Sequence, residues 1–326
     1  MTEPLSARYA RRLVTIPGIV LALWVVTASL PALLVLALFV DLVRGQRTFS
    51  TTRLTGFLFC FLAVENVGLL LLFWTFLTTR AGTRARAART FAIQRLYTAG
   101  HLASVTRLFS LRFVVDGADQ VSPGPLLVFV RHASVIDSLV PGGFIANVHH
   151  FELRYVLKRE LLVEPCLDLA GHWIPNRFVD RSGGDTATEL AALRDLKANL
   201  GPNEGVLIYP EGTRFSRGKR QAILSKLEGP AKARAEQLRH LLPLRRGGAL
   251  TLLDASPSTD VLFVGHHGLE GFTRLHDIWR GALVGKTVTI RFWREPASTL
   301  PSGDDARLAW LDAKWQRMDD WLEGLD

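Results

Sequence analysis

The chain reads LLVFVRHASVID at residues 126–137, where an apolar run passes directly into polar residues. Leu126–Val130 is short and wholly apolar, which is typical of a strand buried on both faces. His132 follows the run, and Asp137 comes five residues later, where the next helix is expected to begin. A carboxylate at this place can turn back to one imidazole nitrogen and leave the other free to accept a proton. The spacing predicts that His132 is a general base oriented by Asp137. A structural histidine beside an Asp helix cap is the alternative.

A second stretch of the same kind, VLIYPEGTR, occupies residues 206–214. Its apolar run again leads into a tight polar loop, and parallel sheets present ligands beyond the carboxyl ends of their strands. We expect Gly212 to permit a close backbone approach and Arg214 to form a paired contact with a phosphate. A turn stabilised by an internal pair between Glu211 and Arg214 is the alternative.

Further short apolar runs predict other strands of the same sheet. They lie at residues 261–264 and 288–292, in addition to the run at 206–209. Amphipathic helices are expected at residues 185–200 and 307–325. The last helix has a mostly acidic polar face, so we expect it to dock on the core and not on a membrane. Strands that alternate with helices favour an α/β domain with a mainly parallel, mixed sheet flanked by helices.

The N-terminal part of the chain is apolar and basic. Residues 13–40 carry no charge, and Glu65 is the only charge between Arg53 and Arg80. Each run exceeds the ~20 residues that cross a bilayer core. The first 95 residues hold 11 Arg and 3 acidic residues, whereas the remainder has 28 Lys and Arg against 27 Asp and Glu. We therefore predict a two-helix membrane anchor at residues 1–95 and the α/β domain at residues 96–326. A cleavable signal peptide is the alternative for the first run.

The arginines beside the two apolar runs predict an orientation. A hairpin places eight of them on one side and three on the other, which favours both termini in the cytoplasm and a cytoplasmic catalytic domain at the cell inner membrane. The alternative is a helix pair embedded in one leaflet, with breaks at Pro31 and Glu65. A charge in lipid is costly, so Glu65 should face protein or water. A nucleic-acid partner is not expected, because the excess positive charge lies outside the folded body.

The sequence favours neither a metal, nor a disulfide, nor a covalent nucleophile. Cys60 lies in an apolar run and forms no framework with Cys166. His149-His150 and His266-His267 are adjacent pairs without further ligand spacing. The G-x-S-x-G pattern of hydrolases is also missing. We expect neither a metal nor another cofactor.

The two polar loops together resemble the 1-acylglycerol-3-phosphate (lysophospholipid) acyltransferase family of the glycerolipid acyltransferase superfamily. His132-x4-Asp137 is similar to the first block of that family, and Tyr209-Pro-Glu-Gly-Thr-Arg214 to the third. The second block of the family is similar to Lys158-Arg-Glu-Leu161, Pro165, Gly171 and Phe178-Val-Asp-Arg181. The fourth block is similar to His240-Leu-Leu-Pro-Leu-Arg-Arg-Gly247. The fourth block looks closest to members that act on larger lysophospholipids.

Two positions depart from the pattern of the family. Arg131 precedes the histidine where Asn is common, and Leu244 follows Pro243 where the members with larger substrates favour a basic residue. The resemblance covers about residues 125–250. Both departures concern the choice of substrate more than the reaction.

The resemblance implies a fold, a reaction and a set of site residues. The fold would be glycerolipid acyltransferase-like. The enzyme would move a fatty acyl group from acyl-CoA or acyl-acyl-carrier protein to the free hydroxyl of a lysophospholipid, with 1-acylglycerol-3-phosphate giving phosphatidate as the leading case. His132 would be the base and Asp137 its orienter. The residues implied for the acceptor are Glu211, Gly212, Thr213, Arg214, Lys158 and Arg181, with Arg214 on the phosphate.

Other interpretations stay open at this point. Lys158 and Arg181 can equally be solvated surface charges, and the acceptor can be a bulkier lysophospholipid. A lipid hydrolase or a membrane lipid-binding scaffold without catalysis are further alternatives. Because a thioester is already activated, acyl transfer needs only a base and donors for the oxyanion. Backbone amides of the His132 loop or of the Glu211 loop are candidates for those donors. The bilayer is the expected membrane partner.

Overall fold

The computed structural model describes residues 3–179, 186–197, 199–270, 272 and 275–325. The chain forms two compact units, each assembled from separate parts of the sequence. The first unit comprises residues 1–111, 157–183 and 276–285, and the second comprises residues 112–156, 184–275 and 286–326. The expected domain boundary between residues 95 and 96 lies inside the continuous helix α3 (Arg84–Phe109).

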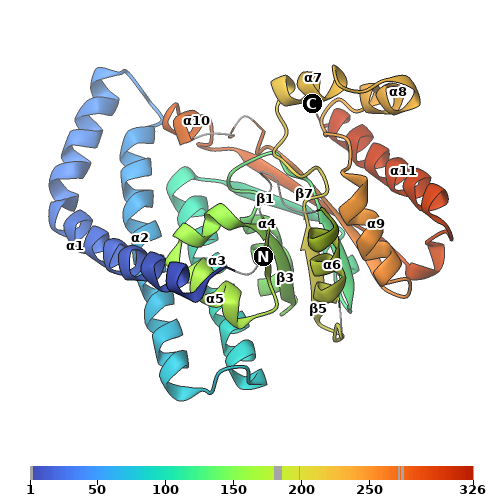
Figure 1. The fold of residues 1–326 in the computed structure, drawn as a ribbon. Helices are drawn as coiled ribbons and strands as arrows, with labels where there is room; N and C mark the ends of the chain where they lie inside the picture. Colours follow the sequence, from blue (N-terminus) through green and yellow to red (C-terminus); the bar gives the residue numbers. More distant parts are fainter. Residues whose placement is uncertain (1–2, 180–185, 198, 271, 273–274, 326) are drawn as a thin grey trace. The chain divides into compact units, whose positions relative to one another are not determined.

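A mixed β-sheet, apart from its edge strand β4, forms the centre of the second unit (Figure 1). The strand order is β1-β7-β6-β2-β5-β3-β4. The pairs β1–β7, β6–β2, β2–β5 and β5–β3 are parallel, and the pair β6–β7 is antiparallel. The strands are β1 (Arg112–Asp116), β2 (Leu126–Val130), β3 (Glu152–Lys158), β4 (Arg177–Val179), β5 (Glu204–Ile208), β6 (Asp260–His267) and β7 (Thr287–Glu295). The predicted fold class, a mainly parallel mixed sheet with helices, is confirmed.

Three helices, α6 (Thr186–Lys197), α9 (Arg246–Ala255) and α11 (Asp304–Glu323), cover one face of the sheet (Figure 1). In their shared core the Phe129 ring of β2 meets the Phe263 ring of β6 edge to face, with 5.6 Å between centroids. Trp315 of α11 is buried there, and its indole N–H donates to the carbonyl oxygen of Leu242 at 3.0 Å. The helix expected at residues 307–325 therefore docks on the core. The short helices α4 (Leu139–Pro141), α7 (Arg217–Leu224) and α8 (Gly229–Gln237) complete this unit.

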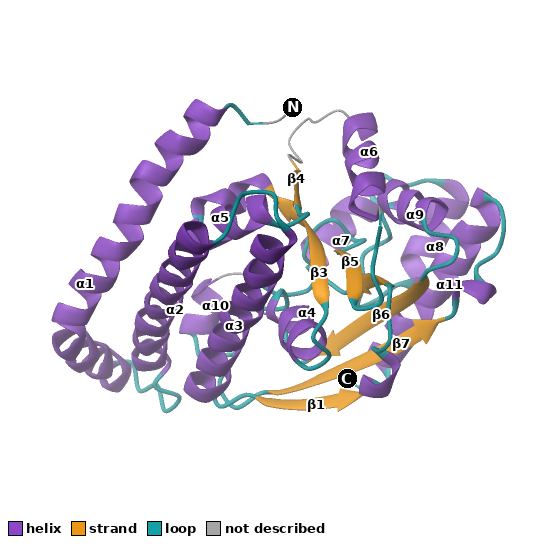
Figure 2. Ribbon diagram, turned by 90° about the horizontal axis from the view of Figure 1, so that it is seen from below, coloured by secondary structure: helices purple, strands orange, loops and turns teal. Residues whose placement is uncertain are grey.

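The first unit is mainly helical, and its helices pack around a small apolar core. Its helix α1 (Leu5–Val43) packs on α2 (Ser50–Thr78), and α2 packs on α3 (Figure 2). The unit also contains α5 (Pro165–Trp173) and α10 (Leu275–Trp279). By length and composition, α1 and α2 are each able to cross a membrane. The most apolar part of α1 is not buried at all, and that of α2 is 28% buried. These two helices favour an association with a membrane.

Both long helices continue through Pro31 and Glu65, the two residues considered as possible breaks. Pro17 and Pro31 lie inside α1, which bends along its course (Figure 1) because proline removes a helical amide donor. Glu65 lies inside α2 and is fully buried, and its carboxylate accepts a hydrogen bond from the Tyr97 hydroxyl of α3. Glu65 thus faces protein, as the cost of a charge in lipid predicts.

Candidate active site

His132 lies just beyond the carboxyl end of β2, with Asp137 beside it. The Nδ1 atom of His132 is 3.2 Å from Oδ1 and 3.1 Å from Oδ2 of Asp137. Facing a carboxylate, Nδ1 carries the proton, which leaves Nε2 unprotonated. The Asp137 side chain is fully buried, whereas the His132 side chain keeps 18% of its surface exposed. This arrangement suits an imidazole that accepts a proton from a bound hydroxyl.

The Asp137 carboxylate also closes the loop that carries His132. Its Oδ2 atom accepts hydrogen bonds from the amides of Ala133 at 2.7 Å and Ser134 at 2.8 Å. Burial alone would raise the pKa of Asp137. The hydrogen bond from His132 and the amide donors outweigh burial, so the pKa lies below its ordinary value. Asp137 is therefore an ionised, fixed partner for the imidazole.

Glu211 connects the His132 loop to the fourth block. One carboxylate oxygen accepts a hydrogen bond from the His132 amide at 2.6 Å, and the other accepts from the Leu242 amide at 2.9 Å. Glu211 is buried, and burial raises its pKa to about 8 against the lowering effect of these two amides. The alternative considered for this loop, an internal pair between Glu211 and Arg214, is not formed among the described residues. Glu211 instead holds the backbone of His132 in place.

The loop after Glu211 turns sharply at Gly212. This residue has φ +71°, and a Cβ atom there would collide with the Arg245 side chain. Gly212 thus provides the close approach that the sequence predicts, toward the fourth block. Thr213 accepts a hydrogen bond from Lys219 through its hydroxyl at 2.9 Å. The Arg214 guanidinium is half-exposed and makes no hydrogen bond or ion pair with any residue that the structure describes.

Arg131, one of the two departures from the family pattern, is a fully buried cross-link. Its guanidinium pairs with Glu270, donates to the carbonyl oxygen of His266, and donates to that of His240 at 3.1 Å. Glu270 in turn accepts a hydrogen bond from the Gly268 amide at 2.6 Å. Arg131 therefore joins the end of β2 to the end of β6 and to the fourth block. Its contacts are with protein and not with the space beside His132.

His266, at the end of β6, is a further residue of the site that the sequence analysis did not identify. Its Nε2 atom is 3.2 Å from the carbonyl oxygen of Arg131 and 3.7 Å from Oδ2 of Asp137. The side chain is fully buried, and burial lowers its pKa to about 4, so the ring is neutral at pH 7. The sequence shows His266 only as one of two adjacent histidines. Its position two residues after the apolar run at 261–264 was the available signal.

The amides of the His132 loop are already engaged. Those of His132, Ala133 and Ser134 donate to carboxylates, as described above. The Val135 amide donates to the Phe272 carbonyl oxygen at 3.1 Å, and the Ile136 amide to the Ser134 hydroxyl at 3.3 Å. In contrast, the amides of Thr213 and Arg214 donate to no residue that the structure describes. Of the two loops proposed to supply oxyanion donors, only the Glu211 loop has amides without a partner among the described residues.

The structure thus brings some of the predicted site residues together and not others. His132, Asp137 and Glu211 are linked by hydrogen bonds, and Gly212, Thr213 and Arg214 follow in the same loop. Lys158 is half-buried at the end of β3 and belongs to the first unit. Arg181 lies outside the described residues. The roles of Lys158 and Arg181 stay predictions.

Comparisons with known proteins found a family model and a solved structure to which this chain is similar. Residues 112–256 match the family model described as Acyltransferase. This chain is similar to the crystal structure of PlsC from Thermotoga maritima, a 1-acyl-sn-glycerophosphate (LPA) acyltransferase, with a TM-score of 0.53. The alignment covers 80% of this chain and 90% of PlsC, at 16% sequence identity. That likeness shows a shared fold. A comparison with curated proteins found no match. The matched segment contains His132, Asp137 and the Glu211 loop, and the chain is therefore an acyltransferase whose residues 112–256 match the Acyltransferase family model.

Proposed function

We propose that the enzyme transfers a fatty acyl group from an acyl thioester to the free hydroxyl of a lysophospholipid, with 1-acylglycerol-3-phosphate as the leading acceptor and phosphatidate as the product. The observation that carries this proposal is the His132–Asp137 pair at the end of β2, in which the second imidazole nitrogen has no partner among the described residues. PlsC, whose fold this chain shares, is an acyltransferase for 1-acyl-sn-glycerophosphate, and this supports the choice of acceptor.

The reaction follows from the two sides of the imidazole. Nε2 of His132 accepts the hydroxyl proton while the hydroxyl oxygen forms a bond to the thioester carbonyl carbon. Asp137 stabilises the imidazolium through Nδ1–H. When the tetrahedral intermediate collapses, the carbon–sulfur bond breaks, and the thiolate leaves with the proton that His132 returns. No covalent intermediate on the protein is needed.

The intermediate carries an oxyanion, which needs hydrogen-bond donors. The amides of Thr213 and Arg214 are the candidates we favour, because the amides of residues 132–136 are engaged. The Arg214 guanidinium would then bind the acceptor phosphate from the same loop, since a planar guanidinium pairs well with phosphate oxygens.

We also propose that α1 and α2 hold the enzyme at a membrane, where both the acceptor and the product reside. Their length and apolar composition support this location. The Arg distribution around them favours an inner membrane with the catalytic domain in the cytoplasm.

The test is an acyltransferase assay with the full chain purified in detergent. A radiolabelled acyl-CoA is offered with a panel of acceptors: lysophosphatidate, lysophospholipids with larger headgroups, and monoacylglycerol. We expect the highest kcat/KM with lysophosphatidate, and His132→Ala should lower turnover by about 10²–10⁴-fold.

Thermal denaturation of the variant serves as the control for folding. A folded His132→Ala enzyme with near-normal turnover would overturn the mechanism. A higher kcat/KM with an acceptor of larger headgroup would replace lysophosphatidate by that acceptor. Release of free fatty acid without transfer to any acceptor would identify a hydrolase.

A further inference from the structure

A cleft of about 410 Å³ in the second unit is lined mainly by arginines. Helix α7 contributes four residues to the lining: Arg217, Arg220, Gln221 and Leu224. The fifth, Arg239, comes from the segment just before the fourth block. Residues 214–226 contain five basic residues and no acidic one, although residues 96–326 as a whole are almost balanced in charge. A local excess of positive charge therefore lies at the cleft and in the segment beside it.

This charge is only partly compensated by acidic groups. Arg239 pairs with Glu323 of α11. Arg220 donates to two backbone carbonyl oxygens, at 2.7 and 3.0 Å, which position its guanidinium without cancelling its charge. Arg217 is exposed, and its guanidinium has no hydrogen bond or ion pair with any part of the chain that the structure describes. The cleft can thus accept an anion.

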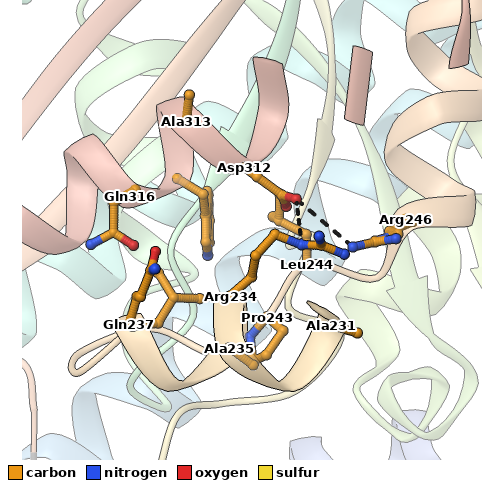
Figure 3. A pocket seen from close by; sticks show the side chains of 12 residues that line it. Ala231, Arg234, Ala235, Gln237, Pro243, Leu244, Arg246, Asp312, Ala313 and Gln316 are labelled. Carbon is orange, nitrogen blue, oxygen red and sulfur yellow. Dashed lines mark ion pairs between the residues drawn. The ribbon is translucent and has the colours of Figure 1, made fainter. Parts of the chain in front are cut away.

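Another cavity of the same unit provides a contrast. It has a volume of about 270 Å³ and is also lined by two arginines, Arg234 and Arg246 (Figure 3). Both approach the same oxygen of Asp312, at 3.4 and 3.8 Å. A carboxylate there already occupies the position that an anionic ligand would take. Arginines line both cavities, so it is the shortage of carboxylates that distinguishes the cleft at α7.

The cleft is connected to the active site through the loop that precedes α7. The Phe215 amide donates to the His132 carbonyl oxygen at 2.7 Å, and Arg217 follows only two residues later. Two residues span at most about 7 Å, so the backbone of Arg217 lies close to the His132 loop. Lys219 of α7 also donates to Thr213 at 2.9 Å and to the Arg214 carbonyl oxygen at 3.1 Å.

The chemistry of the lining selects a ligand. The proposed function gives the acceptor phosphate to Arg214, which leaves the acyl donor as the substrate whose phosphates have no proposed partner. Guanidinium groups suit phosphate oxygens, Gln221 can hydrogen-bond to a base, and Leu224 offers a small apolar wall. The volume falls in the range of about 300–1,000 Å³ that small-molecule sites occupy. A carrier protein would present one phosphate and would need a broad contact surface.

We propose that this cleft, formed by Arg217, Arg220, Gln221, Leu224 and Arg239, binds the phosphate-bearing nucleotide end of an acyl-coenzyme A donor. The inference rests on the proposed acyl transfer. The pantetheine arm would run from the cleft along the Thr213–Arg214 loop toward His132.

The first measurement compares wild type with Arg217→Gln in steady-state kinetics. Arg217 is chosen because its guanidinium has no described partner, so its loss should not disturb the fold. We expect the KM for acyl-CoA to rise about tenfold, the scale of one charged hydrogen bond, with kcat and the KM for lysophosphatidate unchanged. With acyl-pantetheine, which has no phosphate, both proteins should behave alike. Arg234→Gln, in the other cavity, is the matched control and should change neither KM.

The second measurement needs no turnover. Adenosine 3′,5′-bisphosphate is titrated calorimetrically into both proteins, and Arg217→Gln should bind it about tenfold more weakly. An unchanged KM for acyl-CoA, or an equal effect with acyl-pantetheine, would overturn the inference. An effect confined to acyl-acyl-carrier protein would assign the cleft to that donor instead. If wild type binds the nucleotide but transfers no acyl group, the proposed function fails and the anion site stands.

Discussion

Arg214 stands in a loop where the neighbouring carboxylate, Glu211, is already bonded to two amides. If the guanidinium binds a phosphate, Arg214→Ala should mainly raise the KM for lysophosphatidate. The expected loss is about 1.5–3 kcal/mol, the scale of a hydrogen bond to a charged group. Arg214→Lys should restore only part of it, because a point charge cannot replace the planar group. The measurement compares lysophosphatidate with monoacylglycerol. Equal losses with both acceptors would make Arg214 a structural residue.

Glu211 gives the stability of the protein a dependence on pH. Its pKa is raised from 4.5 to about 8, so between these values the folded state binds more protons than the unfolded state. The contribution of Glu211 to stability is therefore full below about pH 4.5 and is lost as the pH rises toward 8. Glu211→Gln cannot titrate and adds a cost that does not vary with pH. We expect the Tm difference between wild type and Glu211→Gln to shrink from pH 5 to pH 8, as followed by thermal denaturation. A constant difference would contradict the raised pKa.

The residues of the site differ in how far sequence reveals them. His132 and Asp137 are five residues apart, so their contact depends on local chain geometry that spacing can express. The partners of Arg131 are distant, because His240, His266 and Glu270 meet it only once the sheet order is formed. Glu211 is similar: its loop was predicted, but its bonds to the His132 and Leu242 amides required tertiary structure.

At the scale of elements, the apolar runs identified the buried strands and missed others. β2, β5, β6 and β7 all overlap the predicted runs. β3 was not predicted, because it reads ELRYVLK and its charged Arg154 breaks the apolar pattern. In the fold, Arg154 is buried and pairs with Glu204 of the neighbouring β5. β1 was also missed, since most of its residues are exposed and it pairs only with β7 at the edge of the sheet.

An element-scale prediction concerns the start of α1, which is tied to α5. Arg11 and Arg12 both pair with the fully buried Asp168, at 3.0 and 2.8 Å. Asp168→Asn removes the charge that holds them, so the first turns of α1 should open more often. Trypsin should then cleave after Arg11 or Arg12 roughly tenfold faster in detergent. Glu160→Gln, at an exposed position of the same unit, is the control. Unchanged cleavage by Asp168→Asn would show that apolar packing alone holds the start of α1.

At the scale of the molecule, the two apolar helices predict how the protein partitions. Together they bury little of their most apolar surface within the protein. We therefore expect high salt and alkaline carbonate to leave the full chain in the membrane fraction and detergent to release it. Protease added to the cytoplasmic face should abolish activity. Release by carbonate would contradict membrane insertion, and loss of activity only in vesicles of opposite orientation would reverse the topology.

The division of the chain into two units is the part of the architecture that is hardest to predict from sequence patterns. Residues 157–183 and 276–285 lie far along the chain, yet they belong to the helical first unit. Their pattern resembles that of any short helix–strand segment, since membership in a unit depends on contacts with distant residues. The carboxylate of Asp168 that pairs with Arg11 and Arg12 is one such contact.

The five amides of residues 132–136 are bonded before any substrate arrives. Such a loop is preorganised, so little of it must rearrange as charge develops during the reaction. The entropy of ordering the loop is lost once, at folding, and not in each catalytic cycle. Slow hydrogen–deuterium exchange at Ala133 and Ser134 would report this rigidity. On warming, local fraying precedes global unfolding, so turnover should decline at the temperature where these two amides begin to exchange.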